Sequence, residues 1–420
     1  MITATQKVPA GYKQTEIGVI PADWDVKRLG EIADVVTGNT PPTSDRSNYG
    51  EDYFFVSPAD LGKGKYILQT EKKLSKKGFS ISRRFPKNSI LFTCIGSTIG
   101  KAGIAPIELT SNQQINAILP NDNFSPDFLF YTLNLIAPKI QSLAGEQAVP
   151  IVNKTEFELT AIALPSDKTE QSTIATALSD TDALIEKLEK LIEKKKNIKQ
   201  GAMQELLTCK RRLPGFTGKW EIKKVGDIGK PYGGLAGKVK ADFGHGNSYY
   251  IPFMNIMSNP VIDPNYLDAV DLRAGENQNK AQKGDLFFNG SSETPEEIGM
   301  CSVLQNDIPD LYLNSFCFGF RLNSDLNTNG LFFSYYFRGS VGRQLIFSLA
   351  QGATRYNLSK TNFLKLRVPY PESEEQTAIA ATLSNMDAEI EKLEAQLTKY
   401  QNLKQGMMQV LLTGKIRLPH

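Results

Sequence analysis

Two stretches of the chain carry the same long pattern of apolar positions. In residues 171–214 apolar side chains recur in steps of four and three, and residues 376–419 repeat this pattern. Such a heptad seam, with Glu and Lys on the outer face, is typical of a helix that packs along another helix. The first seam consists of Ile174, Leu178, Thr181, Ile185, Leu188 and Ile192, and the second of Ile379, Leu383, Met386, Ile390, Leu393, Leu397 and Tyr400.

The two stretches are copies of one another. A shift of 205 positions aligns them without a gap, and about 26 of the 44 aligned positions are identical. A shorter echo precedes each copy, because Trp24–Ile32 matches Trp220–Ile228, and these segments contain the two tryptophans of the protein. The chain is therefore a tandem duplication in which each half is a globular segment followed by a long helix.

The duplicated helices predict a coiled coil. About forty helical residues would span roughly 60 Å, and a single helix of that length has nothing against which to bury its apolar stripe. The other copy of the helix is the simplest partner, so we predict that the two helices pair antiparallel within the chain. The alternatives are pairing with another subunit and coverage of the helix's own domain. By pseudo-symmetry the first domain then follows the C-terminal helix in space, and the two chain ends lie close together.

Short apolar runs bounded by Gly, Pro, Asn and Ser predict strands in the globular segments. In the first segment they lie at 52–61, 89–97, 112–120 and 152–165, with a helix at 125–144 that Ser125 or Asp127 can cap. The second segment repeats this layout at 248–256, 283–292, 313–322, 330–339 and 359–369. Scaffold positions repeat while the loops do not, so we expect one fold to present two different surfaces.

These patterns predict an α+β protein. Two α/β globular domains in a pseudo-two-fold arrangement are expected, separated by two long antiparallel helices that form a coiled coil. The expected boundaries are 1–167 for the first domain, 168–212 for its helix, 213–372 for the second domain and 373–420 for the C-terminal helix.

Composition narrows the class of protein. A chain of 420 residues with 40% apolar content can form several cores. The N-terminus lacks the apolar region of a signal peptide, and no apolar run approaches the ~20 residues of a membrane span. Four cysteines without a C-x-x-C pair and two histidines argue against a zinc site or disulfides, so we expect a reduced, cytoplasmic protein.

Charge is concentrated in one region. The segment Lys63–Lys101 contains ten Lys or Arg residues and a single acidic residue, Glu71. This indicates either an anion-binding surface or a solvated lysine-rich one.

Catalytic motifs are not found. Gly96–Ala102 has three residues between its glycines where a phosphate-binding loop needs four. Asp263–Tyr266 lacks the second proline of the D-P-P-Y motif of amino-methyltransferases. We therefore expect the chain to carry no catalytic, cofactor-binding or metal-binding constellation.

Several motifs accompany the helix copies, which both contain D-A-x-I-E-K-L-E and K-Q-G-x-M-Q-x-L-L-T. The first globular segment contains G-x-T-P (38–41), I-G-S-x-I-G-K (95–101) and S-N-Q-Q-I (111–115). The second contains G-G-L-x-G-K-x-K-x-D-F (233–243) and F-N-G-S-S-E-T (288–294). In combination they resemble the specificity subunit of type I restriction-modification enzymes, over nearly the whole chain. The second segment lacks G-x-T-P and I-G-S-x-I-G-K, so loop roles cannot be transferred between domains.

The resemblance implies a non-catalytic subunit. Two target-recognition domains would each recognise half of a split double-stranded DNA sequence, and the helices would hold them apart. Two methyltransferase subunits would dock on this chain and bring S-adenosylmethionine, and motor-nuclease subunits would join the complex. No cofactor is expected in this chain, and no membrane association.

Loops rich in Lys, Arg, Asn, Gln, Ser and Thr can contact both phosphates and base edges. Because the two loop sets differ, we predict an asymmetric site with two dissimilar half-sites. In the first domain the candidate phosphate contacts are Lys63, Lys65, Lys72, Lys73, Arg83 and Arg84, and the candidates nearer the bases are Thr40, Ser97, Thr98, Lys101 and Gln113. In the second domain the candidates are Lys238, Lys240, Asn255, Asn289, Ser291, Ser292 and Arg355.

Two other functions fit the same pattern. The chain could be a structural coiled-coil tether with protein- or glycan-binding end domains, or a self-contained methyltransferase or nuclease with degenerate motifs. Salt-dependent DNA affinity discriminates against the tether, and binding of S-adenosylmethionine by the isolated chain would favour the enzyme.

Overall fold

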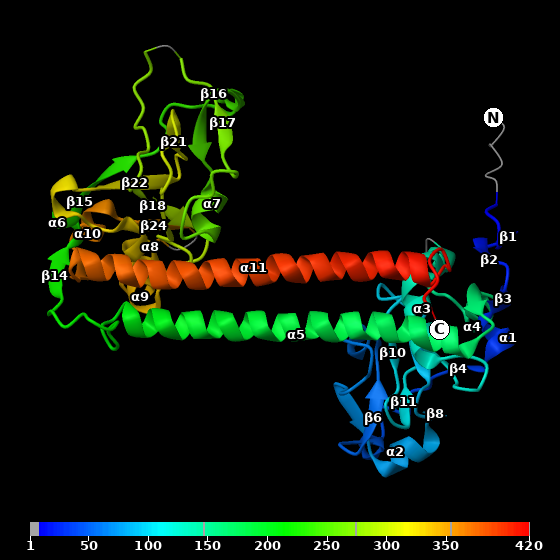
Figure 1. Cartoon of the computed structure of the whole chain (residues 1–420). Coiled ribbons are helices and arrows are strands. Elements are labelled where there is room, and N and C mark those ends of the chain that lie inside the picture. The colour runs from blue at the N-terminus through cyan, green and yellow to red at the C-terminus, as the bar shows by residue number, and fades with distance from the viewer. Residues whose placement is uncertain (1–7, 146–147, 274, 353–354, 420) are drawn as a thin grey trace. The chain divides into compact units, whose positions relative to one another are not determined.

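The computed structural model describes residues 8–145, 148–273, 275–352 and 355–419. Its contacts divide the chain into two units. Unit 1 comprises residues 1–189 and 396–420, and unit 2 comprises residues 190–395. Each unit combines helices and sheets and includes part of both long helices (Figure 1).

Two sheets form the globular part of unit 1. The four-stranded sheet has the order β10-β9-β12-β4, with antiparallel neighbours, and the five-stranded sheet has the order β5-β7-β6-β11-β8, in which β6 and β11 are parallel. Strand pairs β1–β2 and β3–β13 complete the unit. The strands are β1 Tyr12–Thr15, β2 Gly18–Pro21, β3 Trp24–Arg28, β4 Val35–Thr37, β5 Tyr49–Gly50, β6 Tyr53–Val56, β7 Lys72–Leu74, β8 Arg84–Phe85, β9 Ile90–Thr93, β10 Ala102–Ile104, β11 Leu109–Ser111, β12 Ile115–Ile118 and β13 Ala161–Pro165. The short helices are α1 Leu29–Ile32, α2 Lys76–Ile81, α3 Pro126–Gln141 and α4 Lys154–Glu158.

Unit 2 repeats this topology. Its four-stranded sheet, β15-β22-β18-β20, matches β4-β12-β9-β10, and its parallel pair β16–β21 matches β6–β11. Pair β14–β25 corresponds to β3–β13, and β19-β24-β23 forms a small extra sheet. The duplication predicted from the helices is thus confirmed in the globular folds. The strands are β14 Glu221–Lys224, β15 Gly229–Gly233, β16 Phe243–Ile251, β17 Asp268–Val270, β18 Leu286–Asn289, β19 Ser291–Ser292, β20 Cys301–Val303, β21 Leu311–Leu313, β22 Cys317–Leu322, β23 Ala350–Gln351, β24 Tyr356–Leu358 and β25 Arg367–Tyr370, and the short helices are α6 Val225–Ile228, α7 Phe253–Ser258, α8 Gly330–Arg338, α9 Ser340–Phe347 and α10 Lys360–Phe363.

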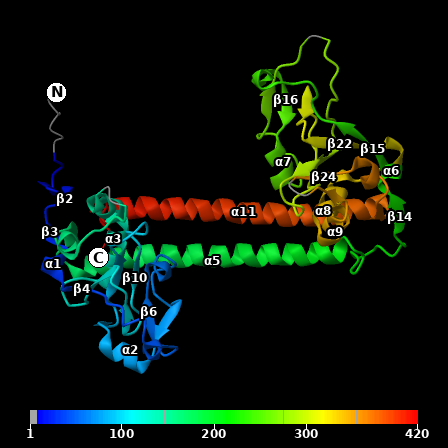
Figure 2. The same ribbon diagram turned by 180° about the vertical axis from the view of Figure 1, so that it is seen from behind.

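The long helices α5 (Lys168–Leu206) and α11 (Ser373–Leu411) run antiparallel within each unit (Figures 1 and 2). In unit 1, Lys404 Nζ lies 2.5 Å from Asp182 Oδ1. In unit 2, Lys195 pairs with Glu389 at 2.6 Å. These ion pairs flank the apolar seam, so the predicted intrachain pairing is confirmed.

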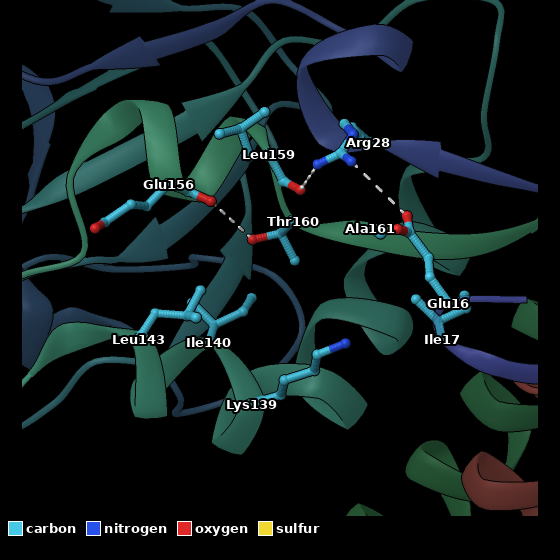
Figure 3. A pocket seen from close by; sticks show the side chains of 10 residues that line it. All are labelled: Glu16, Ile17, Arg28, Lys139, Ile140, Leu143, Glu156, Leu159, Thr160 and Ala161. Carbon is cyan, nitrogen blue, oxygen red and sulfur yellow. Dashed lines mark hydrogen bonds and ion pairs between the residues drawn. The ribbon is translucent and has the colours of Figure 1, made fainter.

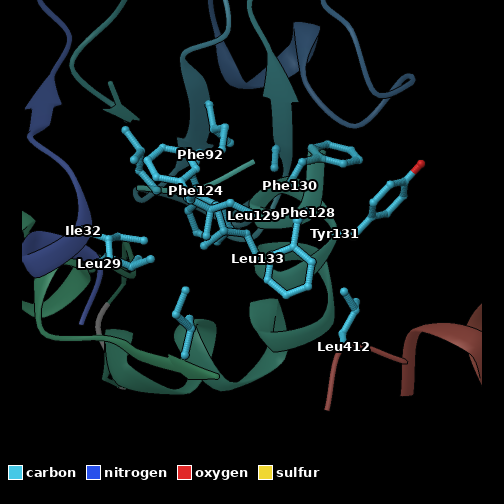
Figure 4. Close-up of a cluster of buried hydrophobic side chains, with 14 of the residues drawn as sticks. Leu29, Ile32, Phe92, Phe124, Phe128, Leu129, Phe130, Tyr131, Leu133 and Leu412 are labelled. Atoms are coloured by element: carbon cyan, nitrogen blue, oxygen red, sulfur yellow. The ribbon is translucent and has the colours of Figure 1, made fainter. Parts of the chain in front are cut away.

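The helix ends complete the cores of the globular parts. Leu411, the last residue of α11, and Leu412, which follows it, belong to the unit 1 core. Figure 4 shows Leu412 together with Phe128 of this core. Leu206 and Leu207, at the end of α5, join the unit 2 core in the same way. Each globular fold therefore depends on the C-terminal end of the helix that starts from the other half of the duplication.

A repeated charge cluster fastens these ends. In unit 1, Trp24 Nε1 donates to Glu170 Oε2 at 3.1 Å, and Arg417 Nη2 donates to the same carboxylate at 2.8 Å. In unit 2, Trp220 Nε1 and Arg212 Nη2 donate to Glu375 Oε2 at 2.8 and 2.7 Å. We call these two groups the Trp-Glu-Arg clusters.

In the same region, described residues near the start of the chain contact residues near its end. Tyr12 Oη donates to the carbonyl of Gly414 at 3.0 Å, and Arg417 Nη1 donates to Asp23 Oδ1 at 2.9 Å. Both contacts lie inside unit 1.

A second repeated group joins each globular part to the helices. Tyr131 Oη donates to Asp182 Oδ2 at 2.6 Å, and Tyr335 Oη donates to Asp387 Oδ2 at 2.7 Å. Each carboxylate also pairs with a lysine of the opposite helix, Lys404 in unit 1 and Lys199 in unit 2. These are the Tyr-Asp-Lys groups.

Among the described residues, no helix is both long enough and apolar enough to cross a membrane.

Candidate nucleic-acid interface

Three sequence motifs of the first domain meet at one place in unit 1. Strand β4 ends at Thr37, and the Gly38 N–H then donates to the carbonyl of Ile115 at 3.0 Å. A Cβ on Gly38 would lie 2.2 Å from the carbonyl oxygen of Asn112, so this close approach requires glycine. The G-x-T-P motif is thereby held against S-N-Q-Q-I, and Thr40 Oγ1 donates to Gln113 Oε1 at 2.6 Å.

The I-G-S-x-I-G-K turn lies against the same loop. The Cys94 N–H donates to the carbonyl of Gln114 at 2.8 Å. Gly96 then adopts a φ of 94°, which a residue with a side chain rarely takes, and a Cβ on it would lie 3.8 Å from Gln114 Nε2. Ser97 follows on the exposed side of the turn. The three motifs thus form a single loop cluster.

Arg83 borders this cluster. Its backbone N–H donates to Asn39 Oδ1 at 2.6 Å, and its Nη1 donates to the carbonyl of Thr37 at 2.7 Å. These bonds position the guanidinium beside the G-x-T-P motif. We define the unit 1 surface by residues that are exposed or partly exposed and joined by these contacts, namely Asn39, Thr40, Arg83, Ser97, Gln113 and Gln114.

Unit 2 builds the equivalent place with the same backbone contacts. A Cβ on Gly234 would lie 2.1 Å from the carbonyl oxygen of Asn314, as that on Gly38 would from Asn112. The Gly290 N–H donates to the carbonyl of Phe316 at 2.9 Å, which matches the bond from Cys94 to Gln114. The supporting strands also match, since β12 and β22 occupy equivalent positions in their sheets.

The side chains at this place differ from those of unit 1. Phe316 is 54% exposed, and the guanidinium carbon of Arg355 lies 5.3 Å from the centre of its ring. Asn314 and Ser315 accompany them on the same loop. We define the unit 2 surface as Asn314, Ser315, Phe316 and Arg355. One backbone arrangement therefore carries an amide- and hydroxyl-rich surface in unit 1 and an aromatic–cation pair in unit 2.

The structure places the other unit 1 candidates in two ways. Lys65 is tied down inside the unit, because its Nζ lies 2.8 Å from Asp127 Oδ1 and 2.7 Å from Ser179 Oγ. Lys73 pairs with Glu51 at 3.1 Å. The exposed ones are Lys63, Lys72, Arg84 and Lys101, and Thr98 is partly exposed.

Most unit 2 candidates serve the fold. Asn255 is fully buried and its amide donates to the carbonyls of Asp263 and Tyr266. Asn289 is also fully buried, and its amide and carbonyl groups bond to Glu297 and Met300. Contact between these amides and DNA would first require these bonds to break.

The remaining unit 2 candidates divide by exposure. Ser291 and Ser292 lie buried in β19. The Lys238 side chain is 4% exposed, and its hydrogen bond to Glu276 is the main reason that the pKa of this carboxyl falls to about 2. Lys240 and Arg355 are exposed. DNA contact remains a prediction for every candidate, and only Arg355 of the unit 2 set lies on the unit 2 surface.

The sequence patterns did not identify Phe316 and Asn314 as candidate surface residues. Phe316, Phe318 and Phe320 alternate, which predicts one buried face of a strand. In the structure β22 begins at Cys317, so Phe318 and Phe320 are buried while Phe316 stands before the strand. The signal that could have found it is the Asn-Ser pair before it, which favours a turn.

A cavity of about 330 Å³ lies elsewhere in unit 1 (Figure 3). Arg28 spans one side of it, donating to the carbonyl of Leu159 at 3.0 Å. The residues that line it are Glu16, Ile17, Arg28, Lys139, Ile140, Leu143, Glu156, Leu159, Thr160 and Ala161. They include no candidate DNA contact, so the unit 1 surface is not part of this cavity.

Comparison with known proteins gives concordant results. The family model described as the type I restriction modification DNA specificity domain matches residues 21–200 and 217–399. The putative type I restriction enzyme MjaX specificity subunit of Methanocaldococcus jannaschii is 27% identical, over 97% of each chain. The MjaIX specificity subunit of the same organism is 32% identical over 52% of this chain and 54% of its own length.

Solved structures show the same fold. The S subunit of a type I restriction-modification system from M. genitalium has a TM-score of 0.58 and 16% identity, over 98% of this chain and 99% of its own. A chain from a study of complex assembly and conformational transition of the type I R-M system has a TM-score of 0.59 and 16% identity, over 94% of this chain and 99% of its own.

Proposed function

The chain belongs to the type I restriction modification DNA specificity family, and we propose that it selects the DNA target of a type I restriction-modification enzyme. Unit 1 would recognise one half of a bipartite double-stranded site and unit 2 the other. The observation that carries this proposal is the pair of surfaces on matched backbones. Gly38 and Gly234 make equivalent close contacts, while the exposed side chains around them differ.

The chemistry of the two surfaces suits base edges. Amides and hydroxyls such as those of Gln113 and Thr40 can donate and accept in the major groove, and a guanidinium can bind guanine through two hydrogen bonds. The exposed lysines Lys63, Lys72 and Lys101 would supply phosphate contacts, which position the duplex without reading its sequence. Because the surfaces differ, the proposed site is asymmetric.

The proposed division of labour leaves catalysis to other polypeptides. Two methyltransferase subunits would assemble with this chain and bring S-adenosylmethionine, and motor-nuclease subunits would complete the enzyme in the cytoplasm. The absence of catalytic motifs from the sequence supports this assignment. The tether interpretation has no support from the family match, because the matched family is one of DNA specificity domains.

Sequencing of methylated bases in cells that carry the complete system tests the proposal. We expect one asymmetric bipartite motif, and its loss when this chain is deleted. Purified chain with its methyltransferase partner should bind that duplex with an affinity that falls steeply with salt, and a scrambled duplex of equal length serves as the control. An unchanged methylation pattern after deletion would contradict the proposal.

A further inference from the structure

The strongest unassigned feature is the aromatic ring of Phe316. A single exposed apolar residue needs no explanation by itself. Phe316, however, is held in place on both sides of its Cα. Its N–H donates to Asn314 Oδ1 at 2.7 Å, and its carbonyl accepts from the Gly290 N–H at 2.9 Å. The loop thus presents the ring outward at the position that Gln114 occupies on the unit 1 surface.

Arg355 reaches this ring from a different segment. It lies directly before β24, which pairs with β19 through Tyr356 and Ser292. Gly352 fits closely under this residue, since a Cβ there would lie 2.1 Å from the Arg355 carbonyl oxygen. The N–H groups of a guanidinium lie in its own plane. Contact of one guanidinium face with an aromatic ring therefore leaves these groups free to donate hydrogen bonds.

The chemistry of this pair matches a particular base step. An arginine recognises guanine through O6 and N7, and a phenylalanine side chain contacts the methyl group of thymine. Successive base pairs are about 3.4 Å apart, and the guanidinium carbon lies 5.3 Å from the ring centre, so the two groups can address neighbouring base pairs. We propose that Phe316 and Arg355 together recognise a thymine next to a guanine in the half-site of unit 2. This inference rests on the proposed function and deepens it.

The test uses the full chain with its methyltransferase partner and the duplex identified by methylation sequencing. Each thymine of the unit 2 half-site is replaced in turn by deoxyuridine, which lacks only the methyl group. We expect one replacement to weaken binding by about fivefold to tenfold. Phe316→Ala should weaken binding to the thymine duplex to a similar degree and should be insensitive to that same replacement. Phe347→Ala, which removes another half-exposed ring of unit 2, should leave both affinities unchanged.

Arginine variants test the second half of the pair. Arg355→Ala should relax the preference for guanine at the neighbouring position. Arg355→Lys keeps the charge but loses the planar fork, so it should retain affinity at low salt without restoring the preference. Thermal unfolding and circular dichroism of each variant show whether the fold is intact.

Three results would overturn the inference. In the first, Phe316→Ala recognises the same bases with unchanged affinity. In the second, Phe316→Ala weakens binding while no deoxyuridine replacement matters, which would make the ring a wedge between base pairs. In the third, Arg355→Ala keeps the guanine preference. If the unaltered complex binds no duplex specifically, the proposed function itself fails, and that result is distinct from all three.

Discussion

At the scale of single residues, Glu170 and Glu375 are buried charges at equivalent positions of the two units. Their side chains are 2% exposed. Each accepts hydrogen bonds from one tryptophan indole and one arginine guanidinium. A buried carboxylate is tolerable only when it is paired and hydrogen-bonded, so the Trp-Glu-Arg clusters should make each unit depend on its arginine.

Removal of that arginine should destabilise one unit only. We expect Arg417→Ala to lower the free energy of unfolding of unit 1 by about 3 kcal/mol, the lower end of the range for breaking a buried pair because the guanidinium is partly exposed. Urea unfolding followed by tryptophan fluorescence measures this, with Trp220 replaced by Phe so that Trp24 alone reports the unfolding of unit 1.

A compensating change provides the control. Glu170→Gln removes the buried charge, so the double variant with Arg417→Ala should recover part of the lost stability. Arg212→Ala should produce the equivalent loss in unit 2. Equal effects of Arg417→Ala on both units would contradict the assignment of each cluster to one unit.

The tyrosines of the Tyr-Asp-Lys groups add a dependence on pH. Burial, then the hydrogen bond to Asp182, raises the pKa of Tyr131 above its ordinary value, and burial and Asp387 do the same for Tyr335. A folded-state pKa raised above that of the unfolded chain gives stability that is complete below the unfolded value, about 10, and that is lost as pH rises further.

Replacement of either tyrosine by phenylalanine tests this. At pH 8 we expect Tyr131→Phe to cost about 1–2 kcal/mol, because the Asp182 carboxylate loses a hydrogen bond. Above pH 10 the difference between the variant and the unaltered protein should shrink, since only the latter loses stability through this tyrosine. Urea unfolding at pH 8 and at pH 11 measures the difference, and a gap that widens with pH would refute the argument.

At the scale of elements, strong periodicity was predictable. Ile174 and Leu178 of the first heptad seam and Ile379 of the second are buried, and they join the cores of unit 1 and unit 2. The helix at 125–144 was also predicted. In the structure this helix, α3, spans Pro126–Gln141, and Ser125 caps its N-terminus. The segment 152–165 was predicted as one strand, yet Asn153 caps a short helix, α4, before β13 begins. Local capping prevailed there over the strand-like apolar pattern.

The candidate site was predictable only in part. Two of the motifs contain a glycine that the fold requires, because Gly38 and Gly234 lie where two backbones approach closely. Which polar side chains face outward was not predictable. Asn289 and Gln113 both occupy loops rich in polar residues, but Asn289 is buried and bonded to its own loop while Gln113 is exposed. A polar residue satisfies a buried backbone as readily as it faces solvent, and only the fold decides between these roles.

At the scale of the whole molecule, the two long helices are the only continuous elements shared by both units among the residues that the structure describes. Each contains 39 residues. In the proposed function these helices determine how far apart the two half-sites can lie. The length of these helices should therefore determine the length of the unread spacer in the DNA sequence that the enzyme modifies.

Matched deletions test this relation. Removal of residues 186–192 from α5 and 391–397 from α11 deletes one heptad from each helix and keeps the seams in register. We expect the unread spacer to shorten by about three base pairs, since one heptad spans about 10 Å. Methylation sequencing measures the spacer.

Deletion from α5 alone is the control, because it leaves the seams mismatched and should destabilise the protein. An unchanged spacer after the paired deletion would mean that the helices do not determine it.

The contribution of Leu411 and Leu412 to the unit 1 core has a consequence for synthesis on the ribosome. The first domain emerges early, yet part of its core and the arginine partner of Glu170 are supplied by residues translated near the end of the chain. At 5–20 residues per second, the roughly 200 residues between α5 and these positions take about 10–40 s to translate. During that interval Trp24 and its neighbours lack their final cover, so the N-terminal domain of the nascent chain should be a chaperone client. The second domain should fold first, because Leu206 and Leu207, which it takes from the end of α5, are already translated.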